Sequence, residues 1–182
     1  MPTIVAELLT VAGMASARTA LTAKYEWFLH VKPVSQFNHV KEKGLEPRNQ
    51  GCTAEPEVLA ARGAGGSNIV CLRPIGTFDT TPRRGNTMYM MALHRDDLPT
   101  TVGLDFSYSG TWTLPAIIKN DCPTATNDDI FCEVVRRRGS VITYEPIPKE
   151  ALRVWTTGKP QNDPSQWPRL VDVERGDIKE FN

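Results

Sequence analysis

The chain has 182 residues, a length at which a single domain can bury a sizeable hydrophobic core. Its 21 basic and 21 acidic residues cancel, which excludes a whole-surface electrostatic attraction to nucleic acid and leaves only a local basic groove open. Hydrophobic residues make up 40% and charged residues 23%, as in ordinary globular proteins. No run of residues approaches the ~20 apolar positions that a membrane span needs.

Residues 1–26 are mildly apolar and predict an amphipathic leading helix. A signal peptide is the alternative, but the segment lacks a basic stretch before its apolar run, and Glu7 interrupts that run. The helix is therefore the preferred interpretation.

The stretch "WFLHVKPVSQFNHVKEKGL" (27–45) predicts a strand followed by a short helix. Residues 27–31 form an apolar run typical of a strand that is buried on both faces, and Pro33 ends it. Ser35 is the expected N-cap, and Gly44 is the expected C-terminal stop, with Leu45 folding back behind it.

The rest of the chain predicts short strands separated by loops, with few helices. Residues 46–67 are rich in Pro, Gly and small side chains and predict a long functional loop. The expected strands are 68–74, 87–95, a fragment within 102–112, 129–138, 139–148 and 149–155; the expected helix is 114–121. Residues 156–182 predict a tail packed through Trp167 and Leu170. This order of elements indicates the α+β class.

The spacing of the cysteines and the absence of several motifs argue against common classes of metal, nucleotide-binding and hydrolase site. Cys52, Cys71, Cys122 and Cys132 include no CxxC pair and no histidine at metal-ligand spacing, so a zinc site is not expected. A reducing compartment is the simpler interpretation, with a Cys52–Cys122 disulfide as the alternative. The sequence also lacks a P-loop, a GxSxG elbow and an HExxH motif.

The 27–45 stretch resembles the first motif of His-type ADP-ribosyltransferases, nearest to the DNA-targeting DarT toxins. More distant likenesses are RNA 2′-phosphotransferases and diphtheria-toxin-like enzymes. In the DarT group the motif runs roughly His-x-Thr, then Asn-Leu, Ile and Gly-Leu. The matching positions here are His30, Lys32, Gln36, Phe37, Val40 and Gly44–Leu45. Lys32 replaces the threonine and Gln36 the asparagine, so the resemblance leaves the acceptor open.

The resemblance implies a split antiparallel β-sheet core and NAD as the substrate. Removing ADP-ribose from NAD breaks a glycosidic bond through an oxocarbenium-like transition state, which a carboxylate can stabilise. His30 would bond the ribose hydroxyls, although a buried structural histidine is an equal alternative. Glu133, expected on a strand between Phe131 and Val135, is the preferred catalytic carboxylate, and Glu145 is its rival.

Four further residues are candidates for binding the cofactor. Arg48 and Arg73 would hold phosphate or ribose through charge-assisted hydrogen bonds. Tyr89 and Tyr108 would stack on the nicotinamide ring, although plain core packing is the commoner role of such aromatics. The arginines of "RRRGS" (136–140) would touch phosphates of a nucleic-acid acceptor or form a solvated edge.

The function expected from the resemblance is mono-ADP-ribosyl transfer by residues 27–155. NAD would be the donor and DNA, RNA or protein the acceptor, as in small toxins, effectors and phage-related enzymes. An antitoxin or immunity protein is a possible partner; no membrane is expected, and the expected location is the cytoplasm, with or without delivery into a target cell. The alternative is a non-enzymatic α+β interaction module, or a degenerate transferase that only binds NAD or nucleic acid.

Overall fold

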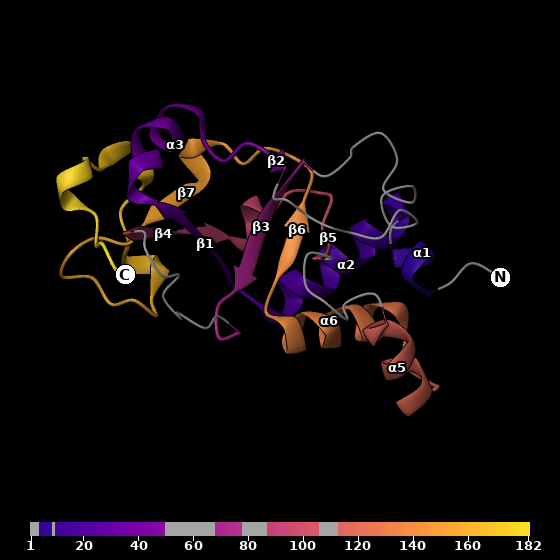
Figure 1. The fold of residues 1–182 in the computed structure, drawn as a ribbon. Helices are drawn as coiled ribbons and strands as arrows, with labels where there is room; N and C mark the ends of the chain where they lie inside the picture. The colour runs from indigo at the N-terminus through magenta and orange to yellow at the C-terminus, as the bar shows by residue number, and fades with distance from the viewer. Residues whose placement is uncertain (1–3, 9, 50–67, 78–86, 106–112) are drawn as a thin grey trace.

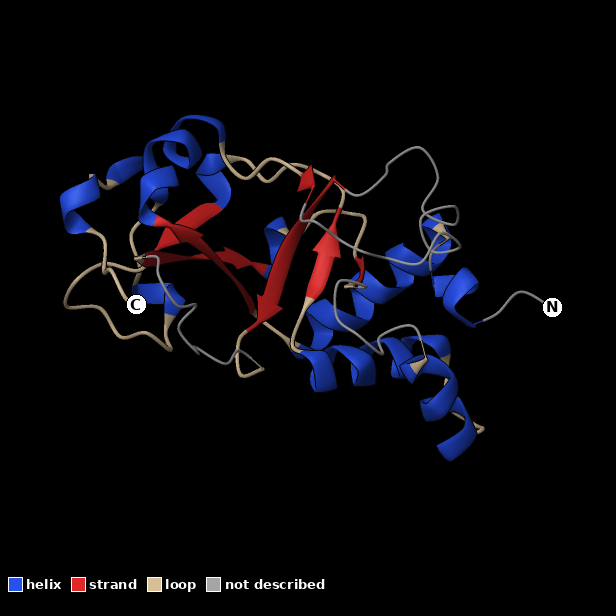
Figure 2. Cartoon of the chain, viewed as in Figure 1, coloured by secondary structure: helices blue, strands red, loops and turns tan. Residues whose placement is uncertain are grey.

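A computed structural model describes residues 4–8, 10–49, 68–77, 87–105 and 113–182. Figure 1 labels the elements, and Figure 2 separates helices from strands. The helices are α1 (Ile4–Leu8), α2 (Val11–Lys24), α3 (Phe37–Lys43), α5 (Leu114–Asp121) and α6 (Asn127–Arg138). The strands are β1 (Trp27–Pro33), β2 (Arg48–Asn49), β3 (Asn68–Pro74), β4 (Met88–His94), β5 (Gly103–Leu104), β6 (Val141–Thr143) and β7 (Leu152–Val154). Short 3₁₀ helices are η1 (Val34–Gln36), η3 (Arg95–Asp97), η4 (Lys149–Ala151), η5 (Pro164–Gln166), η6 (Leu170–Asp172) and η7 (Arg175–Asp177).

The strands form one antiparallel sheet in the order β5-β6-β3-β1-β4-β7, and β2 adds a short pairing to the start of β3. The α+β class is therefore confirmed. The helices α1, α2, α5 and α6 gather near β5 and β6, whereas α3 and the C-terminal segment lie near β4 and β7 (Figure 1).

The two faces of the sheet have separate hydrophobic clusters. Side chains alternate between faces along a strand, and residues paired across antiparallel strands share a face. One face carries Phe28, Tyr89 and Leu93 and packs against side chains of the helices, including Leu21 and Phe131. The other face is smaller and consists of Trp27, Leu29, Met90, Ala92 and, from the C-terminal segment, Trp167.

Most of the elements expected from the sequence are present at or near their predicted positions. The leading segment is helical, although as two helices rather than one. The strand from Trp27 ends at Pro33 as expected, and the strand 68–74 and the helix 114–121 have the predicted bounds. Trp167 and Leu170 are buried, as predicted for the last segment.

The start of α3 differs from the prediction, whereas its end agrees. Ser35 lies within η1, and Gln36 occupies the N-cap position without a side-chain capping bond. Gly44 ends the helix with φ +78°, a conformation that glycine adopts without strain. Leu45 then forms an isolated antiparallel bridge with Ile147, so the chain after α3 is tied to the chain after β6.

The predicted strand 129–138 is wrong, because these residues belong to α6. The Thr126 side chain accepts a hydrogen bond from the Asp129 amide while the Asp129 carboxylate accepts one from the Thr126 amide, which forms a capping box. Arginines occupy the last turn, where the helix dipole favours cations, and Gly139 ends the helix at φ +69°. The apolar residues, which were interpreted with a period of two, instead bury one helical face: Ile130, Phe131, Val134 and Val135.

Candidate functional site

The central strands β1 and β3 separate part-way along their length. β1 pairs with β4 over seven residue pairs, from Trp27–His94 to Pro33–Met88. With β3 it pairs over only two, Phe28–Pro74 and Leu29–Arg73. From His30 onward β1 therefore leaves β3, and β2 pairs with the first residues of β3 instead. We call this opening the β1–β3 fork; Figure 1 shows the two strands diverging.

His30 lies at the point where the fork opens. Its ring is half-buried, and its Nδ1 lies 2.6 Å from the backbone carbonyl oxygen of Cys71. A carbonyl oxygen only accepts, so Nδ1 carries the proton and donates. In the neutral ring this leaves Nε2 as an acceptor, and the hydrogen bond fixes the ring orientation across the fork. The sequence predicted a strand histidine, and the structure adds its partner from a strand 41 residues later.

Two cations lie near His30 at the open end of the fork. Lys32 is two residues further along β1 and therefore on the same face as His30. It is half-buried; burial lowers the pKa of its ammonium group, and the nearby Arg48 lowers it further, while Cys71 acts in the opposite direction. Among the described residues no carboxylate pairs with Lys32. A half-buried, unneutralised ammonium group is costly and favours binding of an anion.

Arg48 is placed on β2 opposite Ile69 of β3. Its Nη2 lies 3.9 Å from the Glu46 carboxylate and close to His39 Nε2, which itself contacts Glu46 at 3.1 Å. These side chains are about half-exposed. Arg48 therefore lies near the fork, where a phosphate-binding residue would be needed. Its positive charge is partly offset by the nearby Glu46 carboxylate.

Arg73 is not brought to the side of the sheet where His30 lies. It pairs with Leu29 in the register of β1 and β3, so it shares the face of Leu29, whereas the adjacent His30 points to the other face. The alternation of side chains along a strand therefore separates the two residues that were expected to share the cofactor.

Tyr89 lies in the core rather than on an open surface. It pairs with Lys32 in the sheet register, is fully buried, and packs edge-on against Phe37 with ring centroids 5.5 Å apart. Burial strongly raises the pKa of its hydroxyl group. With no exposed ring face, Tyr89 cannot stack on nicotinamide in this conformation. Tyr108, the other aromatic candidate, lies outside the described residues.

Glu133 is on α6 and not on a strand of the sheet, which corrects the expectation of its position. Its carboxylate accepts hydrogen bonds from Arg136 at 2.8 and 2.7 Å and from Arg137 at 2.7 Å. These bonds lower its pKa to about 2. Both arginines are one turn further along the same helix, so two of the three arginines of the "RRRGS" segment are paired with Glu133.

Glu145, the rival candidate for the catalytic carboxylate, follows the end of the late strand β6. β1 and β6 both run antiparallel to β3, so their C-terminal ends lie at the same end of the sheet, the end where Lys32 and Arg48 are found. Glu145 Oε2 accepts hydrogen bonds from the Thr101 amide at 2.7 Å and from the hydroxyls of Thr100 and Thr101 at 2.9 and 2.6 Å. Burial acts to raise its pKa, but these hydrogen bonds outweigh it, so the pKa lies below its ordinary value.

One buried carboxylate was given no role from sequence. Asp105, which follows β5, is 2% exposed and accepts a hydrogen bond of 2.7 Å from the Ser140 hydroxyl just after α6. The bond joins the end of β5 to the turn between α6 and β6. The isolated sequence "GLDFSY" carries no signal for this contact, because the partner comes 35 residues later.

Three of the four cysteines lie in the described part of the chain. Cys122 and Cys132 are free thiols, so the Cys52–Cys122 disulfide is not formed here; Cys52 itself lies outside the described residues. The part of the chain that the structure describes brings together no three His, Cys, Asp or Glu side chains able to hold a metal ion.

None of the described helices combines the length and the apolar character of a membrane span.

Comparison with known proteins adds no assignment. The chain matches no protein-family model, no curated protein and no solved structure. The function is therefore inferred from the fork and from the residues at its open end.

Proposed function

We propose that this protein is an NAD-dependent mono-ADP-ribosyltransferase that binds the dinucleotide at the β1–β3 fork. The observation that carries the proposal is the separation of β1 from β3 at His30, whose ring is fixed by the Cys71 carbonyl. The resemblance of residues 27–45 implies a split antiparallel sheet and a strand histidine that bonds the ribose of NAD.

Each part of the reaction has a candidate group at this end of the sheet. His30 is the proposed partner of a hydroxyl of the nicotinamide ribose, and its Nε2, which is buried in this conformation, has to become exposed for that bond to form. Lys32 and Arg48 supply positive charge for the diphosphate. Departure of nicotinamide leaves positive charge on the ribose, and a carboxylate beside that carbon stabilises it.

We assign the carboxylate role to Glu145 and not to Glu133. Glu145 follows a strand at the same end of the sheet as Lys32, and only one of its two oxygens is used by the described hydrogen bonds. Glu133 is engaged through both oxygens by the arginines of its own helix. The acceptor that then attacks the ribose is DNA, RNA or protein, with an antitoxin-like partner as part of the same proposal.

The two glutamates provide a matched experiment. Glu145→Gln should reduce nicotinamide release from NAD at least 100-fold, because the positive charge in the transition state loses its counter-charge. Glu133→Gln should keep the activity within about twofold, since it alters only a surface ion pair. Both rates are measured with labelled NAD, alone and with cell lysate, alongside NAD affinity and thermal unfolding.

The opposite ranking of the two variants would return the role to Glu133. NAD binding without cleavage in the wild-type protein would indicate a degenerate transferase. Absence of any NAD binding would leave the non-enzymatic interaction module as the better description.

A further inference from the structure

A second candidate site lies on the opposite face of the sheet from His30. A pocket of about 330 Å³ opens between the start of β1, the end of β4 and the start of β7. The residues that line it and enter the argument are Trp27, His94, Asp97, Glu150, Arg153 and Arg169. Trp27 and His94 are a pair in the strand register, three residues from His30 along β1, so the pocket does not share the fork. Its volume is that of a site for a small molecule.

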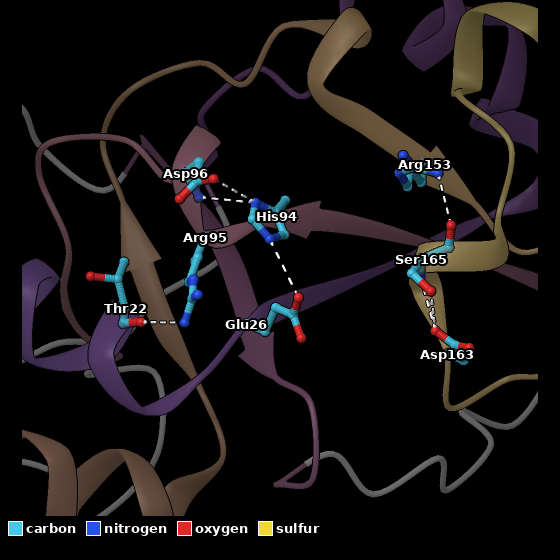
Figure 3. Close-up of polar contacts among 8 residues, drawn as sticks. All are labelled: Thr22, Glu26, His94, Arg95, Asp96, Arg153, Asp163 and Ser165. Carbon is cyan, nitrogen blue, oxygen red and sulfur yellow. Dashed lines mark hydrogen bonds and ion pairs between the residues drawn. The ribbon is translucent and has the colours of Figure 1, made fainter.

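Arg153 is held in place before any ligand arrives. Its Nη1 donates to the backbone carbonyl oxygens of Ser165 at 3.1 Å and Trp167 at 2.7 Å, and its guanidinium carbon lies 5.7 Å from the centre of the Trp27 ring. Figure 3 shows the bond to Ser165. A guanidinium group has five N–H donors, and these contacts use only those on Nη1. The donors on Nε and Nη2 have the spacing that binds a carboxylate through two bonds.

Arg169 brings a second guanidinium to the same pocket. Arg153 and Arg169 face each other across an isolated antiparallel bridge, a geometry in which like charges destabilise the pair. Neither makes an ion pair with any carboxylate in the described part of the chain. An anionic group bound between them would relieve this repulsion.

Two carboxylates limit what that anion can be. Asp97 and Glu150 line the same pocket, are exposed, and have no cationic partner among the described residues. They would repel a polyanion such as a nucleic acid but attract an ammonium group. His94 has its own partners, since Glu26 lies 3.7 Å from its Nε2 and Asp96 3.3 Å from its Nδ1 (Figure 3). The His94 ring therefore has a fixed orientation and lines the pocket beside Trp27; the centroids of the two rings are 4.9 Å apart.

We propose that this pocket binds a small zwitterion, an amino acid, with its carboxylate on Arg153 and Arg169 and its ammonium group toward Asp97 and Glu150. The proposal is independent of NAD chemistry at the fork. Two guanidinium groups and two carboxylates line the same pocket, and this combination of charges selects a zwitterion over simple anions and over simple cations.

The 182-residue protein is titrated with each of the 20 standard amino acids while the Trp27 indole N–H signal is followed by NMR; Trp27→Phe assigns that signal. At least one amino acid should shift it saturably, with Kd below about 1 mM. Its C-terminal amide and its N-acetyl derivative should each bind at least tenfold more weakly. Arg169→Gln and Glu150→Gln should also weaken binding at least tenfold, whereas Arg175→Gln, an exposed residue outside the pocket, should not.

Two results would overturn the proposal. One is that no amino acid binds below about 1 mM to a protein whose amide spectrum shows that it is folded. The other is binding that persists unchanged in Arg169→Gln or with the amide derivative, because the ligand would then not use the guanidinium pair. Neither result depends on whether the protein cleaves NAD.

Discussion

The positive charge of Lys32 is expected to lower the stability of the folded protein and to strengthen the binding of ADP-ribose. Its ammonium group is half-buried near Arg48, and no described carboxylate neutralises it. We expect Lys32→Met to stabilise the folded protein by about 1 kcal/mol in urea unfolding at neutral pH, because it removes a desolvated charge and keeps the alkyl packing. The same variant should bind ADP-ribose about tenfold more weakly, because the diphosphate loses a cation.

The pH dependence of the Lys32 effect has a defined sign. The folded-state pKa of Lys32 is lowered below the 10.5 of the free side chain, so above that lowered value the unfolded chain binds more protons than the folded one. The stability advantage of Lys32→Met should therefore shrink as pH rises toward 10.5. Lys41→Met, at a lysine that pairs with Glu174 at 2.7 Å, is the control and should change neither binding nor this pH dependence. Stabilisation of equal size in both variants would contradict the argument.

Single residues could be located from the sequence more reliably than the partners that they contact in the fold. His30 was placed in a strand because its neighbours are apolar, and Gly44 was placed at a helix end because the residues before it have helical periodicity. The Cys71 carbonyl that fixes His30 was not predictable, because its contact depends on the register of two strands 41 residues apart in the sequence. Register also decides that Arg73 points away from His30.

At the element scale, α6 offers a direct test of the corrected assignment. The Thr126 hydroxyl accepts a hydrogen bond from the Asp129 amide, one of the groups that a helix leaves without an internal partner. Thr126→Ala should lower the free energy of unfolding by about 1 kcal/mol, the usual contribution of an N-cap. Thr157 is exposed, and its side chain makes no described hydrogen bond. Thr157→Ala should therefore change the free energy of unfolding by less than about 0.5 kcal/mol, as is usual for surface substitutions. Equal urea midpoints for the two variants would be inconsistent with a capped helix at 126.

The elements that were predicted correctly are those whose own residues mark where they begin or end. The strand 68–74 is an apolar run closed by Pro74, and the helix 114–121 begins with a proline in its first turn. For α6 the apolar residues fit both a period of two and a helical period, and the Thr126–Asp129 capping box and Gly139 decide for the helix. The resemblance implied a split sheet, but the position of the fork could not be predicted, because neither β1 nor β3 contains a local signal for where their pairing ends.

At the scale of the whole molecule, the C-terminal segment completes the second core and does not behave as an appendage. Trp167 is 1% exposed and stacks near Trp155 with ring centroids 6.3 Å apart. Its cluster includes Trp27, Leu29 and Met90, which belong to β1 and β4, the strands whose other face supports the helix-covered core. The two cores share these strands, so loss of one should weaken the other.

Trp167→Ala tests this coupling. We expect it to lower the free energy of unfolding by about 3–5 kcal/mol, the usual cost of removing a large buried aromatic side chain. Unfolding should remain a single transition when followed by both circular dichroism and Trp fluorescence, because β1 and β4 cannot keep one packed face when the other is lost. A variant in which the C-terminal segment melts first, while the helical signal keeps the wild-type midpoint, would show instead that the segment unfolds as an independent unit. Trp155 is half-buried at the edge of the same cluster. Trp155→Ala should therefore lower the free energy of unfolding clearly less than Trp167→Ala does, and it serves as the comparison variant.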